Sequence, residues 1–350
     1  MSDRTKIVIN GAGEVGWSTA YAIAMSSSKP LDIVLIDLPT STIEGKTRKL
    51  EECVLAMHRD ITVTGIAKEI SNEDITVFGG MGNNSTELSY YLAGADLVIN
   101  TAGFPRDKEV KYRGELVTFK TREAVNVANV DITTDIAHNV GKYAQGALFL
   151  QVANQVDSQA RLAYDILKTY QFDASKVVSM NYLDQVRLTL NLAKYLKVNP
   201  NSVSVMLAGV HEDRMVPLFS QCYVDGKPVE LSDEEMKEIT KQTVDGGSWM
   251  SSKMNKKTSE AEPGACVAYI VSTLLEPEKY EGQVFSLGTY ADASTWGFSG
   301  GLMGLPSKIS LKHGAIPIAM PSNLTEQEHT NLKASFANSL EMYTYMMSKQ

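Results

Sequence analysis

Short apolar runs alternate with helix-like stretches through the first half of this sequence. Four runs are apolar almost throughout, at residues 6–10, 31–36, 96–101 and 147–153. Apolar residues three to four positions apart predict helices at 17–25 and 42–57, a further helix ends within 140–146, and 75–78 is a candidate strand. Strands that are buried on both faces and alternate with helices are typical of a parallel sheet covered on both sides. The pattern therefore predicts an α/β fold with a doubly wound parallel sheet.

The second half is less regular and predicts an α+β domain. Helices are expected at 158–170, 185–196, 232–244, 265–275 and 322–347. Strands are expected at 203–207 and 221–224, the second followed by a turn at Asp225-Gly226. The helix that opens at Asp157 or Ser158 marks the boundary, so we predict two domains spanning 1–157 and 158–350.

Composition and charge exclude several classes of protein. With 43% hydrophobic and 21% charged residues, the chain has the composition of a globular protein rather than a disordered one. The 33 basic and 41 acidic residues give a net charge of −8, which argues against a nucleic acid as partner. The first residues lead into an apolar run too short for a secretory signal or a membrane helix, so we expect a cytoplasmic protein without a membrane partner.

The cysteines and histidines do not suggest a metal centre. Cys53, Cys222 and Cys266 form neither a disulfide framework nor a CxxC pattern, and the five histidines lack the spacing of a metal site. Cys53 and Cys266 lie in apolar, helix-like stretches, where a buried cysteine acts as a small hydrophobic residue.

A glycine-rich turn follows the first predicted strand and opens the first predicted helix. Its six residues are Gly11, Ala12, Gly13, Glu14, Val15 and Gly16. In such a turn the first glycine makes the bend, the second lets the backbone approach a diphosphate, and the third lets the helix pack closely. Asp37 ends the second predicted strand, 21 residues after the last glycine, where a carboxylate binds a ribose 2′-hydroxyl and repels a 2′-phosphate. The arrangement predicts a Rossmann-type site for NAD rather than NADP.

The second half carries groups suited to moving a proton during hydride transfer. His211 follows a predicted strand, and Asp184 and Arg187 are three residues apart on one helix face. Asn154 ends a strand at the edge where such sheets bind ligands. Taken alone, the Asp–Arg pair is more typical of a surface ion pair, and a single loop histidine is more typical of a solvated residue.

Five motifs, in a fixed order along the chain, connect these residues with one protein family. They are GAGEVG at 11–16, TAGFPR at 101–106, VANQVD at 152–157, LDQVR at 183–187 and GVHEDRMVP at 209–217. With them the chain resembles the NAD-dependent lactate and malate dehydrogenase family from about residue 5 to about residue 345. The resemblance implies a homodimer or homotetramer that interconverts a 2-hydroxy acid and its 2-oxo acid.

The resemblance also assigns roles. It makes His211 the acceptor of the substrate's hydroxyl proton, Asp184 the partner of its imidazole and Arg187 the clamp on the substrate carboxylate. It has Asn154 bond the substrate oxygen, and it has Arg113, on a loop running from Arg106, close over the site. The cofactor residues that it adds are Thr101, Ala102, Gly103, Asn129 and Asn154.

Arg106 favours (S)-malate and oxaloacetate over lactate and pyruvate. It stands where malate dehydrogenases carry an arginine and lactate dehydrogenases usually a glutamine, and a second buried carboxylate needs a paired cation. Several positions depart from the family pattern. The separation of Arg106 from Arg113 is one residue longer, and the segment from 116 to 129 is extended. Other departures are Gln155 for proline, Glu212 for glycine and Asn181 before LDQVR, while Thr258 aligns only loosely with a residue lining the substrate site.

Three alternatives remain open from the sequence. The first is a lactate or other 2-hydroxy-acid dehydrogenase, with Lys108 or the longer lid replacing the usual contacts. The second is an NAD-binding interaction protein without activity, against which the intact His211, Asp184 and Arg187 set argues. The third is an NAD-dependent glycosidase on a related fold, which would need a Cys/His metal site, and nothing in the sequence demands one.

Overall fold

The computed structural model describes residues 4–39, 41–67, 85–211, 213–254, 260–290 and 296–350. The candidate strand at 75–78 and the departures noted at Glu212 and Thr258 lie outside these residues. No helix within the described ranges combines the length and apolar character needed to cross a membrane.

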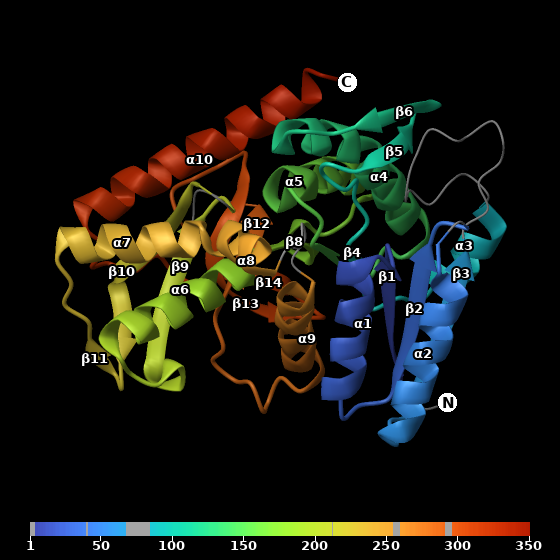
Figure 1. The fold of residues 1–350 in the computed structure, drawn as a ribbon, viewed down its shortest axis with the longest axis horizontal. Helices are drawn as coiled ribbons and strands as arrows, with labels where there is room; N and C mark the ends of the chain where they lie inside the picture. The colour runs from blue at the N-terminus through green and yellow to red at the C-terminus, as the bar shows by residue number, and fades with distance from the viewer. Residues whose placement is uncertain (1–3, 40, 68–84, 212, 255–259, 291–295) are drawn as a thin grey trace.

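One half of the molecule is built on a parallel sheet (Figure 1). Its strand order is β3 (Ile61–Ala67), β2 (Leu31–Asp37), β1 (Thr5–Asn10), β4 (Leu97–Asn100), β7 (Leu148–Gln151) and β8 (Val177–Met180). All neighbouring pairs in this series are parallel. The predicted doubly wound sheet is confirmed, and its shortest strands are only four residues long.

Helices cover both faces of this sheet, so alternate strand residues enter different cores. Ile7 and Ile9 pack on the side of α1 (Glu14–Ser26), α2 (Ile43–Ala56) and α9 (Ala261–Leu275). Val8 packs on the opposite side with α4 (Arg122–Tyr143) and α5 (Val156–Leu167). α3 (Ser85–Leu92) precedes β4. This two-sided burial explains why the strands read as continuous apolar runs rather than as alternating ones.

The second half extends the same sheet with antiparallel strands. β12 (Phe285–Tyr290) pairs with β8, and the order continues through β13 (Leu302–Ser310), β9 (Val203–Gly209), β10 (Met215–Val224) and β11 (Lys227–Pro228), with β14 (Gly314–Pro317) beside β13. Its helices are α6 (Tyr182–Leu196), α7 (Asp233–Val244), α8 (Gly246–Met254) and α10 (Glu326–Met347). Three single 3-10 turns lie at Lys168–Tyr170, Ala174–Lys176 and Pro200–Ser202. Because β8 joins the parallel sheet after residue 157, the two-domain division stays a prediction.

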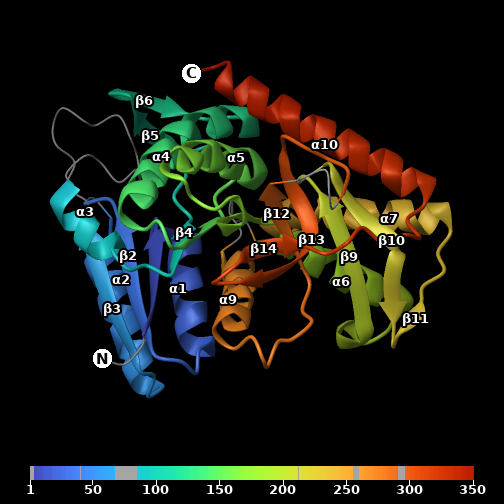
Figure 2. The same cartoon turned by 180° about the vertical axis from the view of Figure 1, so that it is seen from behind.

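The segment expected to be a loop after Arg106 is a β-hairpin. β5 (Glu109–Tyr112) pairs with β6 (Glu115–Thr118), and a two-residue turn joins them. Both turn residues have positive φ, +48° at Arg113 and +87° at Gly114, which matches the twist of a type I′ hairpin. The extended segment from 116 is therefore the second strand followed by α4, not a longer lid loop. In both views the hairpin lies near the end of α10 (Figures 1 and 2).

The cysteines differ from expectation at one position. Cys266 and Cys222 are buried, at 5% and 1% exposed, whereas Cys53 is only half-buried. Cys53 lies on α2, whose buried positions are Ile43, Leu50 and Val54. The prediction that Cys53 is buried is wrong because α2 turns only one stripe of residues into the core.

Candidate active site

The glycine-rich turn between β1 and α1 is packed closely against the segment after β4. Gly11 has φ of +90°, and a Cβ there would lie 2.6 Å from the backbone of Ala102. A Cβ on Gly16 would lie 1.8 Å from the carbonyl oxygen of Gly11 and 2.5 Å from Oγ1 of Thr101. A Cβ on Gly13 would meet nothing within 4 Å. Two glycines thus allow tight packing, and the third leaves open space in front of the helix.

This open space lies where an anionic group would meet α1. The helix begins at Glu14 and has no side-chain cap, so its first N–H groups and its dipole favour a negative charge. Asp37 lies at the end of the neighbouring strand, with its Oδ1 accepting the N–H of Leu38 at 2.9 Å. Burial raises the pKa of Asp37, and the Leu38 N–H and the Lys46 charge partly offset that effect. The residues present fit the diphosphate and the ribose of NAD.

Asn129 of α4 ties two further predicted cofactor segments together. Its Oδ1 accepts the N–H of Phe104 at 2.8 Å, and its Nδ2 donates to the carbonyl oxygen of Asn154 at 2.7 Å. Thr101 bonds back to the glycine turn through Oγ1, which donates to the Gly11 carbonyl at 2.5 Å. Gly103 lies against Asn129, where a Cβ would be 3.2 Å from Nδ2. The peptide bond from Asn154 to Gln155 is cis.

His211, Asp184 and Arg187 form a contiguous group. The Nδ1 atom of His211 lies 2.6 Å from Oδ2 of Asp184, whose side chain is 1% exposed. The other carboxylate oxygen of Asp184 accepts Nη1 of Arg187 at 3.4 Å. The Nε atom of Arg187 is buried and has no hydrogen-bond partner among the described residues. Such a buried, unsatisfied guanidinium suits an anionic ligand.

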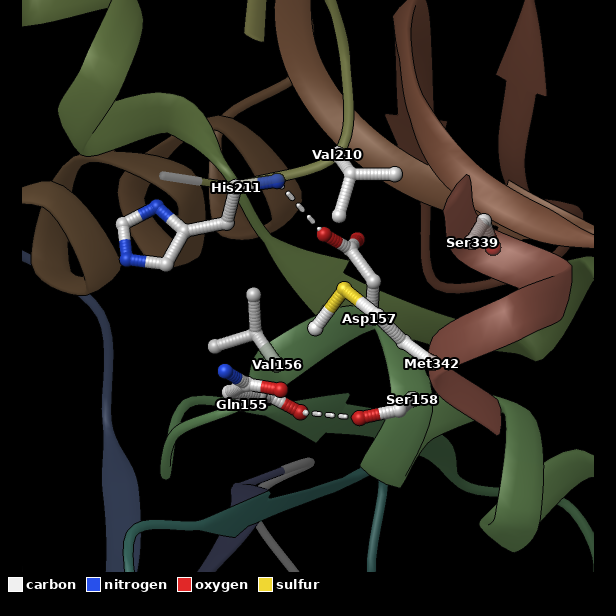
Figure 3. Close-up of a pocket in the computed structure, with 8 residues that line it drawn as sticks. All are labelled: Gln155, Val156, Asp157, Ser158, Val210, His211, Ser339 and Met342. Atoms are coloured by element: carbon white, nitrogen blue, oxygen red, sulfur yellow. Dashed lines mark hydrogen bonds between the residues drawn. The ribbon is translucent and has the colours of Figure 1, made fainter. Parts of the chain in front are cut away.

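The fold explains how residues distant in sequence meet here. Asp184 lies in the first turn of α6, where its N–H bonds the carbonyl oxygen of Asn181. His211 lies two residues beyond Gly209, the last residue of β9, and its backbone N–H donates to Oδ2 of Asp157 at 2.7 Å (Figure 3). Ser335 of α10 accepts the N–H of Val210 at 2.9 Å. The main chain leading into His211 is therefore anchored to two helices, α5 and α10.

Two predicted substrate residues form ion pairs with neighbouring aspartates. The guanidinium of Arg113, at the hairpin tip, donates twice to Asp131 of α4, at 3.1 Å and 3.0 Å. Arg106 lies 3.6 Å from Asp107, with 45% of its side chain exposed. To contact a substrate beside His211, each guanidinium would have to exchange its aspartate for the substrate.

A cleft of about 270 Å³ opens beside the imidazole. It is lined by Glu123, Asn126, Gln155, His211, Asp213, Arg214, Asn338, Met342 and Tyr345. Most of these were not expected from the sequence, because they belong to α4 and α10, which carry no recognisable motif. Gln155 lies in the motif at 152–157, and Asp213 and Arg214 lie in the motif at 209–217, so their positions in these motifs were the available signal.

Comparisons with known proteins show which sequences this chain resembles. Residues 182–343 match the family model of the lactate/malate dehydrogenase α/β C-terminal domain. The malate dehydrogenase of Thermoplasma acidophilum is 28% identical over 313 residues, 88% of this chain and 87% of that protein. The malate dehydrogenase of Flavobacterium johnsoniae is 28% identical over 342 residues, 96% of this chain and 95% of that protein.

Solved structures share the fold. Malate dehydrogenase from Cryptosporidium parvum superposes with a TM-score of 0.80 at 24% identity, covering 99% of both chains. Lactate dehydrogenase from the same organism superposes with a TM-score of 0.78 at 22% identity, covering 98% of this chain and 99% of that one. The resemblance inferred from the five motifs is confirmed.

Proposed function

We propose that this chain, which resembles the lactate/malate dehydrogenase family, interconverts (S)-malate and oxaloacetate with NAD as cofactor. The observation that carries the proposal is the 2.6 Å contact between His211 and the buried Asp184, with Arg187 bound to the same carboxylate.

The contact with Asp184 determines which imidazole nitrogen is available. A carboxylate beside Nδ1 holds a proton on that atom, so Nε2 carries the lone pair that accepts the proton of the substrate hydroxyl. In the reverse direction the imidazolium returns this proton to the new alkoxide, and the charge of Asp184 stabilises it meanwhile.

Arg187 is proposed to bind the carboxylate next to the reacting carbon. Its buried Nε has a hydrogen still to donate, and a planar guanidinium binds a carboxylate through two parallel hydrogen bonds. Gly246 and Gly247 of α8 border this guanidinium, since a Cβ on either would lie 3.2 Å and 3.4 Å from Arg187 atoms respectively. Asn154 is proposed to donate to the substrate oxygen.

The glycine turn and α1 would hold the diphosphate of NAD, and Asp37 would bind the adenosine ribose. Thr101, Ala102, Gly103 and Asn129 would form the wall beside the nicotinamide half. NAD, when bound, supplies the hydride acceptor for the substrate carbon.

The choice of malate over lactate depends on Arg106, which we propose pairs with the second carboxylate of oxaloacetate. The decisive measurement is NADH oxidation with oxaloacetate and with pyruvate, with NADPH in parallel. Oxaloacetate should be turned over faster than pyruvate, and Arg106→Gln should depress oxaloacetate turnover far more than pyruvate turnover. Lys120→Gln is the matched control, because Lys120 lies 3.9 Å from the same Asp107.

Other outcomes of that measurement favour the remaining candidates. A clear preference for pyruvate would assign lactate, and NAD binding without turnover of any 2-oxo acid would indicate an interaction protein. A cytoplasmic location, a place in the tricarboxylic acid cycle and a homodimeric or homotetrameric state are further parts of the proposal. Light scattering on the purified protein tests the oligomeric state.

A further inference from the structure

A second carboxyl group lies against the main chain of His211. Asp157, in the first turn of α5, is 3% exposed, and its Oδ2 accepts the backbone N–H of His211 at 2.7 Å (Figure 3). Its Oδ1 lies 2.8 Å from Oγ of Ser179 and 3.0 Å from Nδ2 of Asn181. None of the roles proposed above uses this carboxyl group.

The surroundings of Asp157 leave little room for water. A Cβ on Gly288 of β12 would lie 2.9 Å from its Oδ1 and 1.7 Å from Oγ of Ser179, so the sheet is in contact with the carboxyl group. Asp157 also borders a cavity of about 10 Å³, lined in part by Ser339 and Met342 of α10, which is at the lower limit of the ~10–15 Å³ that one water needs. The hydrogen bonds of the carboxyl group therefore come mainly from the protein.

The hydrogen atoms around Asp157 can be counted. Oγ of Ser179 makes two short oxygen–oxygen contacts, 2.8 Å to Oδ1 of Asp157 and 2.7 Å to Oδ1 of Asn181, yet its hydroxyl carries one hydrogen. If Asp157 is ionised, one of these contacts joins two oxygens with no hydrogen between them. Rotating the Asn181 amide does not help, because its oxygen would then face the carboxylate at 3.0 Å and 3.2 Å.

A proton on Asp157 satisfies every contact. Its O–H donates to Ser179, Ser179 donates to Oδ1 of Asn181, and Nδ2 of Asn181 donates back to the carboxyl group. Oδ2 still accepts the backbone N–H of His211. We propose that Asp157 is a positioning residue for the proposed reaction, whose neutral carboxyl group fixes the main chain of His211 without placing a second negative charge beside the imidazole.

The electrostatic setting agrees with a neutral carboxyl group. Burial raises the pKa of Asp157, and hydrogen bonds from His211, Asn181 and Ser179 only partly oppose that effect. Among the described residues, His211 is the titratable group whose charge acts on Asp157, and its ring is bound to Asp184. β8 and the start of α6 contribute Ser179 and Asn181, and β12 contributes a glycine. Asp184 therefore contacts the ring of His211 as a carboxylate, and Asp157 contacts the backbone of His211 as a neutral carboxyl group.

Two substitutions separate this role from its alternatives. Asp157→Asn keeps the shape and the neutral charge, with an oxygen for the His211 N–H and an NH₂ for Ser179. We expect it to leave kcat nearly unchanged and the pH profile of kcat/KM unmoved. Asp157→Ala removes the acceptor, and we expect kcat to fall about a hundredfold with KM nearly unchanged, as for a misplaced catalytic group.

Contrary results would overturn the proposal. If Asp157→Asn moves the pH profile by about one unit, Asp157 is ionised, since a charge within about 4–6 Å has that effect. If Asp157→Ala keeps full kcat, the contact does not position His211. Should the alanine variant not fold, Ser179→Ala, which opens the same ring of hydrogen bonds, takes its place, with a fall in kcat expected and an unchanged kcat contradicting the proposal.

A spectroscopic readout does not depend on activity. Infrared spectra of the full chain at neutral pH should contain a carbonyl band of a protonated carboxyl group that disappears in Asp157→Asn. Asp165→Asn is the control, because Asp165 is ion-paired with Arg161 at 2.9 Å and should contribute no such band. An absent band refutes the neutral state. A chain without dehydrogenase activity refutes the proposed function while the band still decides the protonation of Asp157.

Discussion

Replacing Asp184 by Asn tests the proposed chemistry most directly. The carboxylate lies 2.6 Å from Nδ1 of His211 and is 1% exposed, so solvent screens the interaction little. The amide has nearly the same shape, but its NH₂ donates to Nδ1 and moves the ring hydrogen to Nε2. The nitrogen that should accept the substrate proton would then be blocked. Since a general base contributes about 10²–10⁴-fold, we expect kcat for malate oxidation to fall by about that factor.

Asp184→Asn should also move the pH profile of the reaction in a defined direction. Loss of the neighbouring negative charge destabilises the imidazolium, so proton release occurs at lower pH. Malate oxidation needs neutral imidazole, and its acidic limb should move to lower pH in Asp184→Asn. Oxaloacetate reduction needs imidazolium, so the alkaline limb of its pH profile should also move to lower pH. The pH range over which oxaloacetate is reduced then becomes narrower.

The assay is NADH formation or loss across pH at saturating cofactor, with thermal unfolding to establish that the variant is folded. Glu52→Gln, which removes an exposed carboxylate paired with Arg48, is the control for loss of charge alone. A folded Asp184→Asn protein with wild-type kcat and an unmoved pH profile would refute the assignment of His211 as the base.

Four further predictions concern other parts of the molecule. Asp37→Asn should weaken NAD binding about tenfold to hundredfold, the equivalent of about 1.5–3 kcal/mol for a hydrogen bond to a charged group, as titration calorimetry can measure. Burial raises the pKa of Asp37, so above the unfolded-state pKa of about 3.9 the ionisation of Asp37 opposes folding. The same variant should therefore raise the Tm of the apoprotein at neutral pH but not in acid. Gly247→Ala places a Cβ 3.4 Å from Nη2 of Arg187 and should raise KM for oxaloacetate with little change in kcat; steady-state kinetics showing the reverse pattern would contradict carboxylate binding there. Burial raises the pKa of Cys222 and of Cys266 to about 12, so neither thiol should be alkylated at neutral pH until the chain is denatured, as mass spectrometry of the labelled protein can establish.

The sequence pattern predicted β1, β2, β4 and β7, because burial on both faces leaves a nearly unbroken apolar run. It did not predict β8, nor β3, which is an edge strand with only one buried residue. The pattern did not predict β12 and β13, because packing contacts, rather than strand propensity, select their residues. Gly288 and Gly304 are required by close contacts with Ser179 and with the carbonyl oxygen of Gly209, and a glycine within an apolar run weakens the strand pattern. Only the tertiary structure supplies the reason for those glycines.

The candidate site divides in a similar way. His211 and Asp184 are 27 residues apart, and the family motifs, not spacing, brought them together. Asp157 stood inside a quoted motif, yet an aspartate in the first turn of a helix is ordinarily explained by the helix dipole. Its contact with the backbone of His211 depends on how the β9–β10 connection packs against α5, which no local pattern encodes.

The hairpin β5–β6 is a segment at which this protein can be altered. Its two ends lie side by side, because the N–H of Asp107 donates to the carbonyl oxygen of Phe119 at 2.9 Å. Its ladder is separate from the main sheet, so its length sets no register elsewhere. The segment between these two residues can thus be exchanged for a relative's loop without touching the main sheet, provided that an apolar residue stays at position 110, because Val110 packs in one cluster with Phe104 and Ile132.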